Sequence, residues 1–129
     1  PLPLGAIHNQ RSLLALDNLV DLIVTCLKSP AAANQTFLAA DGHDLSTTEL
    51  LKLLGDALGS YSRLFPLPIR CIEMGARLVG KSSIAQRLCG SLQVDISKTK
   101  KLLAWQPIIS VEEGLRRVAN GFLNEKKSC

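Results

Sequence analysis

Arg11 is the side chain in this sequence whose type and position are best suited to binding an anion. It lies in the polar segment 9–12, directly before an apolar stretch that leads into a helix opened by Asp17 or Asn18. A guanidinium group in such a place can donate two hydrogen bonds to one phosphate. The alternative is a surface arginine that pairs with a nearby carboxylate, Asp17 or Asp21, and spacing alone favours this alternative.

Two amide side chains, Asn9 and Gln10, precede Arg11. Amide groups donate to and accept from the hydroxyls of a sugar or the edge of a base. Asp95 lies at the end of an expected strand, where a catalytic carboxylate would also fit. We assign it a structural role instead, because Asp95 and Ser97 are placed to accept backbone N–H groups at the start of the next helix.

No residues are spaced as metal ligands or as a catalytic nucleophile with its base. His8 and His43 are the only histidines, and neither has a partner at a metal-binding spacing. None of the cysteines lies in a zinc-binding pattern or near a histidine. They are Cys26, Cys71, Cys89 and Cys129. We expect reduced cysteines, as in a cytoplasmic protein.

The segment 75–82 matches the phosphate-binding pattern of glycine, four residues and Gly-Lys-Ser. Such a P-loop must follow a buried strand and precede a helix. Here the preceding segment 69–74 has helical spacing and follows Pro68, so we interpret the match as coincidence. The alternative, a P-loop nucleotidase, would lose ATP binding in the variant Lys81→Ala.

The elements expected to position these side chains are about five helices and three or four short strands. Two capping boxes, Ser46–Glu49 and Ser110–Glu113, mark helix starts. Alternating or short apolar runs predict strands at 12–16, 36–40, 63–66 and 92–96. These strands are too few and too scattered to form a doubly wound sheet of their own.

The last third of the chain has the most informative order of elements. Apolar and polar residues alternate over 92–96, which is typical of a half-buried strand. A short helix capped by Ser97 follows, and Pro107 ends it near Trp105, which we assign to the core. The capping box Ser110–Glu113 then opens another helix.

This order resembles the C-terminal signature of the extended short-chain dehydrogenase/reductases, the nucleotide-sugar epimerases and dehydratases. Residues 11–19 are similar to a second element of that family, an arginine followed by a strand and a helix opened by Asp or Asn. The resemblance covers nearly the whole chain and is most specific over 9–27 and 92–115. It implies an α/β fragment, a single substrate-binding subdomain over residues 1–129 without the Rossmann domain.

The resemblance also implies roles for two arginines. In the family, the arginine at the position of Arg11 contacts the diphosphate of the nucleotide sugar. Arg87 precedes the strand 92–96, where the family often places another phosphate- or uridine-binding arginine, although the family's Arg-Pro-Gly-Asp loop is absent here. The alternative for Arg87 is a helix-face arginine. The expected substrate-binding residues are therefore Arg11, Arg87 and Asn9.

The chemistry of the family requires NAD, a glycine-rich turn and a Tyr-x-x-x-Lys pair. This sequence has no such turn, and Tyr61 is followed four residues later by Phe65 instead of lysine. We therefore expect no catalytic residue here, NAD bound outside this chain, and no activity of the chain alone. The resemblance implies a UDP-hexose or UDP-N-acetylhexosamine 4-epimerase as the parent. A 4-ketoreductase, a 4,6-dehydratase or a non-catalytic helical interaction module are the alternatives.

Bulk properties limit the partners. With 129 residues, 47% hydrophobic and 20% charged, the chain fits one soluble domain, and Pro1 in place of methionine indicates a start inside a longer protein. No apolar run reaches the ~20 residues of a membrane span, and no secretion leader is evident.

The net charge of +4 forms no basic stripe, which argues against nucleic acid. Expected partners are a nucleotide sugar, the missing N-terminal Rossmann domain and, through exposed apolar faces, a second copy in a homodimer.

Overall fold

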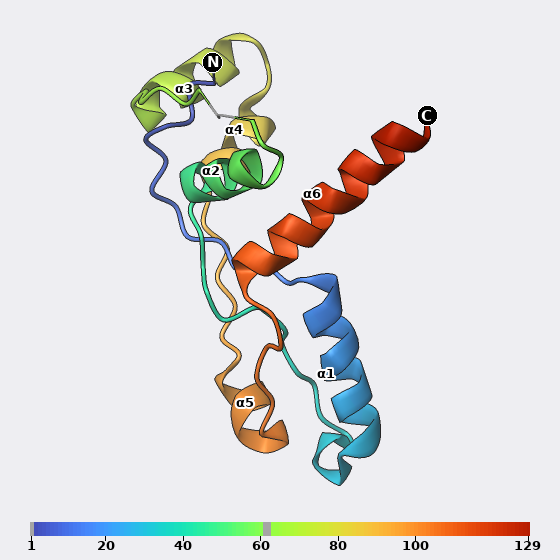
Figure 1. The fold of residues 1–129 in the computed structure, drawn as a ribbon. Coiled ribbons are helices and arrows are strands. Elements are labelled where there is room, and N and C mark those ends of the chain that lie inside the picture. The colour runs from blue at the N-terminus through green and yellow to red at the C-terminus, as the bar shows by residue number, and fades with distance from the viewer. Residues whose placement is uncertain (1, 61–62) are drawn as a thin grey trace. The chain divides into compact units, whose positions relative to one another are not determined.

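The computed structural model describes residues 2–60 and 63–129, so the features noted at Pro1 and Tyr61 lie outside the described residues. Figure 1 colours the helical elements in chain order, from blue at the N-terminus to red at the C-terminus. They are α1 (Leu16–Lys28), the 3₁₀ turn η1 (Pro30–Ala32), α2 (Thr47–Ala57), α3 (Ile69–Leu78), α4 (Ser82–Cys89), α5 (Ser97–Leu103) and α6 (Val111–Ser128).

The prediction of an α/β fragment with three or four strands is wrong. The described residues form six α-helices and no strand. Within residues 2–60 and 63–129, extended segments meet only at isolated bridges, between Leu2 and Leu64 and from Arg11 to both Leu45 and Leu92. The fold is therefore helical, with extended connections.

Short polar side chains explain why the extended segments do not form ladders. A ladder needs successive backbone N–H groups to reach backbone carbonyls on the neighbouring segment. Here the N–H of Gln10 donates to Ser91 Oγ at 3.0 Å, and the N–H of Val94 donates to Ser12 Oγ at 2.8 Å. Serine hydroxyls thus replace the carbonyls that a strand partner would offer. Alternation predicted the extended backbone correctly, but not the side-chain capture of its donors.

The chain divides into two compact units that are interleaved along the sequence. The first unit comprises the described part of 1–11 together with 45–92, and the second comprises 12–44 together with 93–129. The first contains α2, α3 and α4, and the second contains α1, η1, α5 and α6. Each unit is therefore built from segments far apart in sequence.

The capping box of α2 is confirmed, and it anchors the first unit. Ser46 Oγ accepts the N–H of Glu49 at 3.1 Å, and Glu49 Oε2 accepts the N–H of Ser46 at 2.8 Å. The next turn ties in the N-terminal segment, because Thr48 Oγ1 accepts the N–H of Ile7 and donates to the carbonyl of Leu4. The predicted stop also holds, since α2 ends before Gly59, whose φ is +67°.

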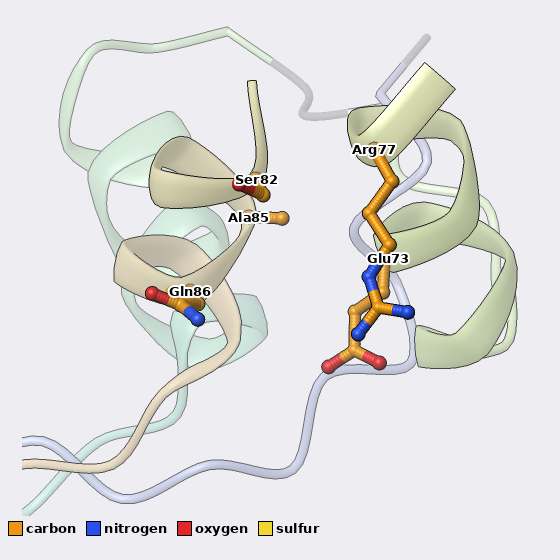
Figure 2. Close-up of a pocket in the computed structure, with 5 residues that line it drawn as sticks. All are labelled: Glu73, Arg77, Ser82, Ala85 and Gln86. Carbon is orange, nitrogen blue, oxygen red and sulfur yellow. The ribbon is translucent and has the colours of Figure 1, made fainter. Parts of the chain in front are cut away.

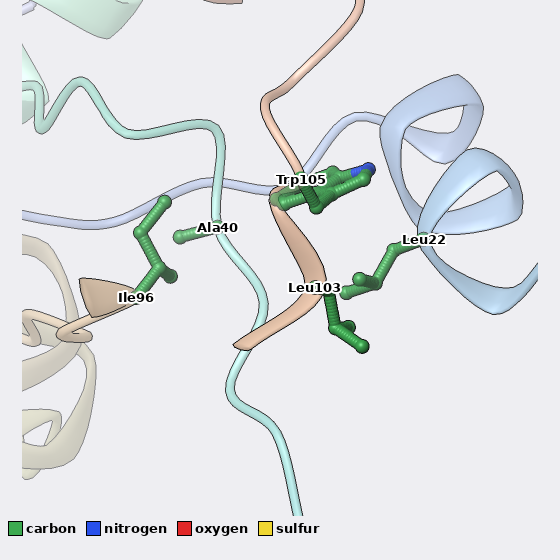
Figure 3. Packing of buried hydrophobic residues seen from close by; sticks show 5 residues of the cluster. All are labelled: Leu22, Ala40, Ile96, Leu103 and Trp105. Atoms are coloured by element: carbon green, nitrogen blue, oxygen red, sulfur yellow. The ribbon is translucent and has the colours of Figure 1, made fainter. Parts of the chain in front are cut away.

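The second unit contains the apolar cluster shown in Figure 3. Its buried members come from α1, α5 and the connections around them. They are Leu22, Ala40, Ile96, Leu103 and Trp105. Trp105 is 3% exposed, so its assignment to the core is confirmed, and its indole N–H donates to Asp21 Oδ2 at 2.8 Å. The hydrogen bond satisfies the polar edge of the ring within the cluster.

Helix α1 begins without the side-chain cap predicted from its own sequence. Its N-cap is Ala15, and the N–H of Ala15 donates to the carboxylate of Asp41. Capping by Asp17 or Asn18 is therefore wrong, because a carboxylate from a distant segment takes that place. Asn18 is fully buried instead. The predicted role of Asp95 is confirmed, since its Oδ1 accepts the N–H of Ser97 at 2.9 Å.

Candidate functional site

The two arginines predicted to bind substrate lie together in the first unit. The guanidinium of Arg11 donates a hydrogen bond to the backbone carbonyl of Arg87, in the last turn of α4. The backbone of Arg11 is fixed by its N–H, which donates to the carbonyl of Leu45 at 2.9 Å, and by its carbonyl, which accepts the N–H of Leu45 at 3.0 Å. One arginine therefore reaches the other from a well-held backbone position.

The Arg87 side chain is exposed at the end of α4. Within the residues that the structure describes, no carboxylate lies within ion-pair distance of its guanidinium, since the three ion pairs involve Arg116 and Arg117. The carboxylates considered as partners for Arg11 are engaged within the second unit. Asp17 pairs with Arg117 at 2.6 Å, and Asp21 accepts from Trp105. The guanidinium donors at α4 are thus available to an anion.

Asn9 lies beside this pair but faces the protein. Its side chain is 5% exposed. The Nδ2 group donates to Thr47 Oγ1 at 3.1 Å and to the carbonyls of Leu88 and Gly90 at 3.3 and 2.7 Å. Its Oδ1 accepts the N–H of Thr47 at 2.8 Å. The contact of Asn9 with substrate stays a prediction.

Gly90 permits the close turn that ends α4. Its N–H donates to the carbonyl of Gln86 at 2.8 Å. A Cβ at this position would lie 2.5 Å from that carbonyl oxygen, closer than side chains tolerate. The chain therefore turns tightly after Arg87 and brings its last carbonyls toward Asn9. No sequence pattern indicated that Thr47 or the Gly90 carbonyl would contact Asn9, because threonine inside a capping box and glycine after a helix are both common.

A small pocket lies between α3 and α4, as Figure 2 shows. It measures about 80 Å³ and its lining residues are Glu73, Arg77, Ser82, Ala85 and Gln86. Ligand pockets for small molecules usually span about 300–1,000 Å³, so a nucleotide sugar does not fit here. Burial, and to a lesser extent the charge of Glu73, raises the pKa of the nearby Cys89 thiol.

The P-loop-like segment 75–82 lies in a helical hairpin. Gly75 is inside α3, Gly80 turns the chain with φ of +70°, and Ser82 begins α4. A helix precedes the glycine turn where a phosphate-binding loop requires a strand. The helical structure predicted for 69–74 is confirmed, and it fits the interpretation of this match as coincidence. In the described part of the chain, no cluster of His, Cys, Asp or Glu could hold a metal, and no helix is long and apolar enough to cross a membrane.

Comparison with known proteins decides the resemblance. The chain is 51% identical to a UDP-glucose 4-epimerase of Vibrio cholerae over 124 residues, which is 95% of this chain and 38% of that protein. It is 47% identical over 55 residues, 38% of this chain and 17% of the relative, to a UDP-glucuronate 4-epimerase of Thermodesulfobacterium geofontis strain OPF15. This chain is similar to the C-terminal part of a UDP-glucose 4-epimerase. The predicted resemblance is confirmed.

The epimerase relative is much longer than this chain, which spans 38% of its length. No family model matches the sequence, and no solved structure matches it. The match covers almost the whole chain, but it assigns no role to Arg11 or Arg87. The roles of these residues therefore depend on the geometry at the end of α4.

Proposed function

We propose that this chain is the nucleotide-sugar-binding part of an NAD-dependent 4-epimerase that acts on a UDP-hexose or a UDP-N-acetylhexosamine. The similarity to UDP-glucose and UDP-glucuronate 4-epimerases supports this class of enzyme. The observation that carries the proposal is the meeting of Arg11 and Arg87 at the end of α4. The whole chain, 1–129, serves as one substrate-binding subdomain.

The two guanidinium groups would neutralise the diphosphate of the substrate. A guanidinium has five N–H donors, and Arg11 gives one hydrogen bond to the carbonyl of Arg87. Most of its donors, and those of Arg87, therefore remain for phosphate oxygens. A charge-assisted hydrogen bond of this kind contributes about 1.5–3 kcal/mol. Holding the substrate by its phosphates positions the sugar for reaction.

The residues of this chain do not fit NAD. The sequence has no glycine-rich dinucleotide turn and no Tyr-x-x-x-Lys pair, and the described residues form no strand to precede such a turn. NAD supplies hydride chemistry when it is bound. It would be held by a part of the longer protein that lies outside the region represented by this chain. Substrate binding is the function that these residues can perform, and a soluble, cytoplasmic setting fits it.

The exposed apolar face of helix α1 supports a dinucleotide-binding domain as a partner. One of its faces carries a continuous row of exposed apolar side chains, from Leu16 at 74% exposure to Leu27 at 81%. Its other members are Val20, Ile23 and Val24. An apolar row of this length marks an interface. Because the Vibrio cholerae relative is far longer than this chain, we assign the row to the dinucleotide-binding domain, with a homodimer and a helical interaction module as the competing explanations.

Titration of the chain with UDP tests the binding proposal. Arg11→Ala and Arg87→Ala should each weaken UDP binding by about 1.5–3 kcal/mol, which is roughly 10- to 150-fold. Arg70→Ala is the matched control, because Arg70 is an exposed arginine on α3 of the same unit. Calorimetry gives the affinities and amide NMR shifts give the location. Equal losses in all three variants, or no UDP binding by the unmodified chain, would contradict the proposal.

A further inference from the structure

The end of α4 is held by side chains from two other segments of the first unit. Backbone carbonyls in the last turn of a helix have no partner within the helix. Here the carbonyl of Arg87 accepts from Arg11, and that of Leu88 accepts from Asn9 at 3.3 Å and from Thr47 Oγ1 at 2.5 Å. The carbonyl of Gly90 accepts from Asn9 at 2.7 Å. We call Asn9, Thr47 and these last two carbonyls the α4 clasp.

The clasp is buried and its side-chain groups are fully bonded. Asn9 and Thr47 are 5% and 6% exposed. The two residues also bind each other, because Asn9 Oδ1 accepts the N–H of Thr47 and Asn9 Nδ2 donates to its hydroxyl. A substrate contact through the Asn9 amide would break its bond to Gly90 and leave that part-buried carbonyl without its side-chain donor. The clasp therefore argues against Asn9 as a direct ligand.

Asn9 and Arg11 lie two residues apart on an extended segment, and side chains at that spacing lie on the same side. Both of them reach the end of α4, Asn9 in the interior and Arg11 at the edge. The clasp thereby fixes the backbone that bears Arg87 against the backbone that bears Arg11. It also occupies the carbonyls of Leu88 and Gly90, which would otherwise compete with a phosphate for the guanidinium donors.

We propose that Asn9, acting with Thr47, is a positioning residue that sets the spacing of the Arg11 and Arg87 guanidinium groups for two linked phosphates. This inference rests on the proposed nucleotide-sugar function. Its consequence is selectivity: the chain should prefer a nucleoside diphosphate to a nucleoside monophosphate because only the former spans both groups. Loss of the clasp should therefore lower the affinity for a nucleoside diphosphate more than the affinity for a nucleoside monophosphate.

The experiment compares the affinities of UDP and UMP in two variants of Thr47. Thr47→Val keeps the shape of the side chain and removes the hydroxyl, whereas Thr47→Ser retains the hydroxyl. We expect the ratio of UDP to UMP affinity to fall roughly tenfold in Thr47→Val and to stay near the unmodified value in Thr47→Ser. Circular dichroism checks that each variant is folded. A folded Thr47→Val with an unchanged ratio overturns the inference and leaves the proposed function intact.

A second measurement uses the unmodified chain and so does not depend on the folding of a variant. The Asn9 side-chain amide signals should be the same in the complexes with UDP and UDP-glucose, because the clasp keeps this amide from the sugar. A shift caused by the added glucose alone shows direct contact and overturns the inference. If the unmodified chain binds no UDP, or Arg11→Ala has no effect, the proposed function fails and the inference fails with it.

Discussion

Each unit of this chain is held together by a buried asparagine, and the two asparagines differ in what surrounds them. Asn18 in the second unit is 0% exposed. Its Nδ2 donates to Asp41 and to the carbonyl of Ile109, and its Oδ1 accepts the N–H groups of Ile108 and Ile109. Asn9 makes a comparable set of bonds in the first unit, but next to two arginines instead of an apolar cluster.

Under the proposal above, the same amide chemistry serves stability at Asn18 and positioning at Asn9. Asn18 joins α1 to the segment before α6, in the unit that contains the Trp105 cluster. Asn9 joins an extended segment to the ends of α2 and α4, where the exposed edge carries guanidinium groups. A change at Asn18 should therefore appear in folding, and a change at the α4 clasp should appear in ligand selectivity.

The largest effect is expected for the variant Asn18→Leu, which tests the stabilising role of Asn18. The substitution removes the Asn18 partner of the Ile108 N–H, the Ile109 N–H and the Ile109 carbonyl, while Asp41 keeps its hydrogen bond from Ala15. Each unsatisfied buried group costs about 1–3 kcal/mol, so we expect a loss of at least about 2 kcal/mol in the free energy of unfolding. Urea denaturation followed by Trp105 fluorescence measures it. A loss below the effect of an exposed control such as Asn124→Leu would contradict the stabilising role.

The sequence predicted local features well because their causes are local. The capping box Ser46–Glu49 depends on residues three apart, and the end of α5 before Pro107 was predicted from one ring, so both depend on near neighbours. Trp105 was assigned to the core from its type and context. The resemblance to epimerases came from the order of such local signals over 92–115, and the comparison confirmed it.

The absence of strands from the described residues and the hydrogen bonds of the buried asparagines could not be predicted from local signals. Alternation over 92–96 predicts an extended backbone, but whether its N–H groups meet carbonyls or a serine such as Ser12 depends on a segment some 80 residues away. The bonds of Asn18 reach residues about 90 positions away. The prediction that Arg11 and Arg87 bind substrate is untested, and the structure adds that they are neighbours.

A smaller effect is expected where the second unit exposes its apolar row on α1. Ile23→Lys lies on that row, at a position that is 50% exposed, whereas its neighbour Leu22 is buried. In the isolated chain it should change the free energy of unfolding by no more than about 0.5 kcal/mol. In a fusion that places this chain in the position of the matching part of the Vibrio cholerae relative, it should cost about 1–3 kcal/mol, because the row would be buried there.

Thermal unfolding of both forms measures this difference. Val118→Lys, at an exposed apolar position on α6 of the same unit, is the control for a general effect of added charge. Equal effects of Ile23→Lys in the chain and in the fusion would contradict docking of the dinucleotide-binding domain on α1. If sedimentation instead shows a dimer of the isolated chain that Ile23→Lys dissociates, the row is an interface between two copies.

The smallest expected effect concerns Asp44, at the edge of the second unit. Hydrogen bonds from Ser12 Oγ at 2.6 Å and then from Gln93 Nε2 at 2.9 Å stabilise its charged form and lower its pKa from the ordinary 3.8. A carboxyl group with a lowered folded-state pKa stabilises the fold fully above its unfolded value and loses that contribution as the pH falls through the folded value. Stability should therefore decline below about pH 3.8.

Ser12→Ala removes the larger of these two causes and should raise the pKa of Asp44 toward 3.8. Carbon-detected NMR titration of the carboxyl group measures that shift directly. The same serine accepts the N–H of Val94, so the variant also removes one of the side-chain acceptors that stand in for a strand partner. If the extended segment at Val94 then shows greater hydrogen exchange while Ser83→Ala in the first unit does not change it, the hydroxyl is what holds that segment. Unchanged exchange would mean that packing alone maintains the extended backbone, and the account of why no strand forms would be wrong.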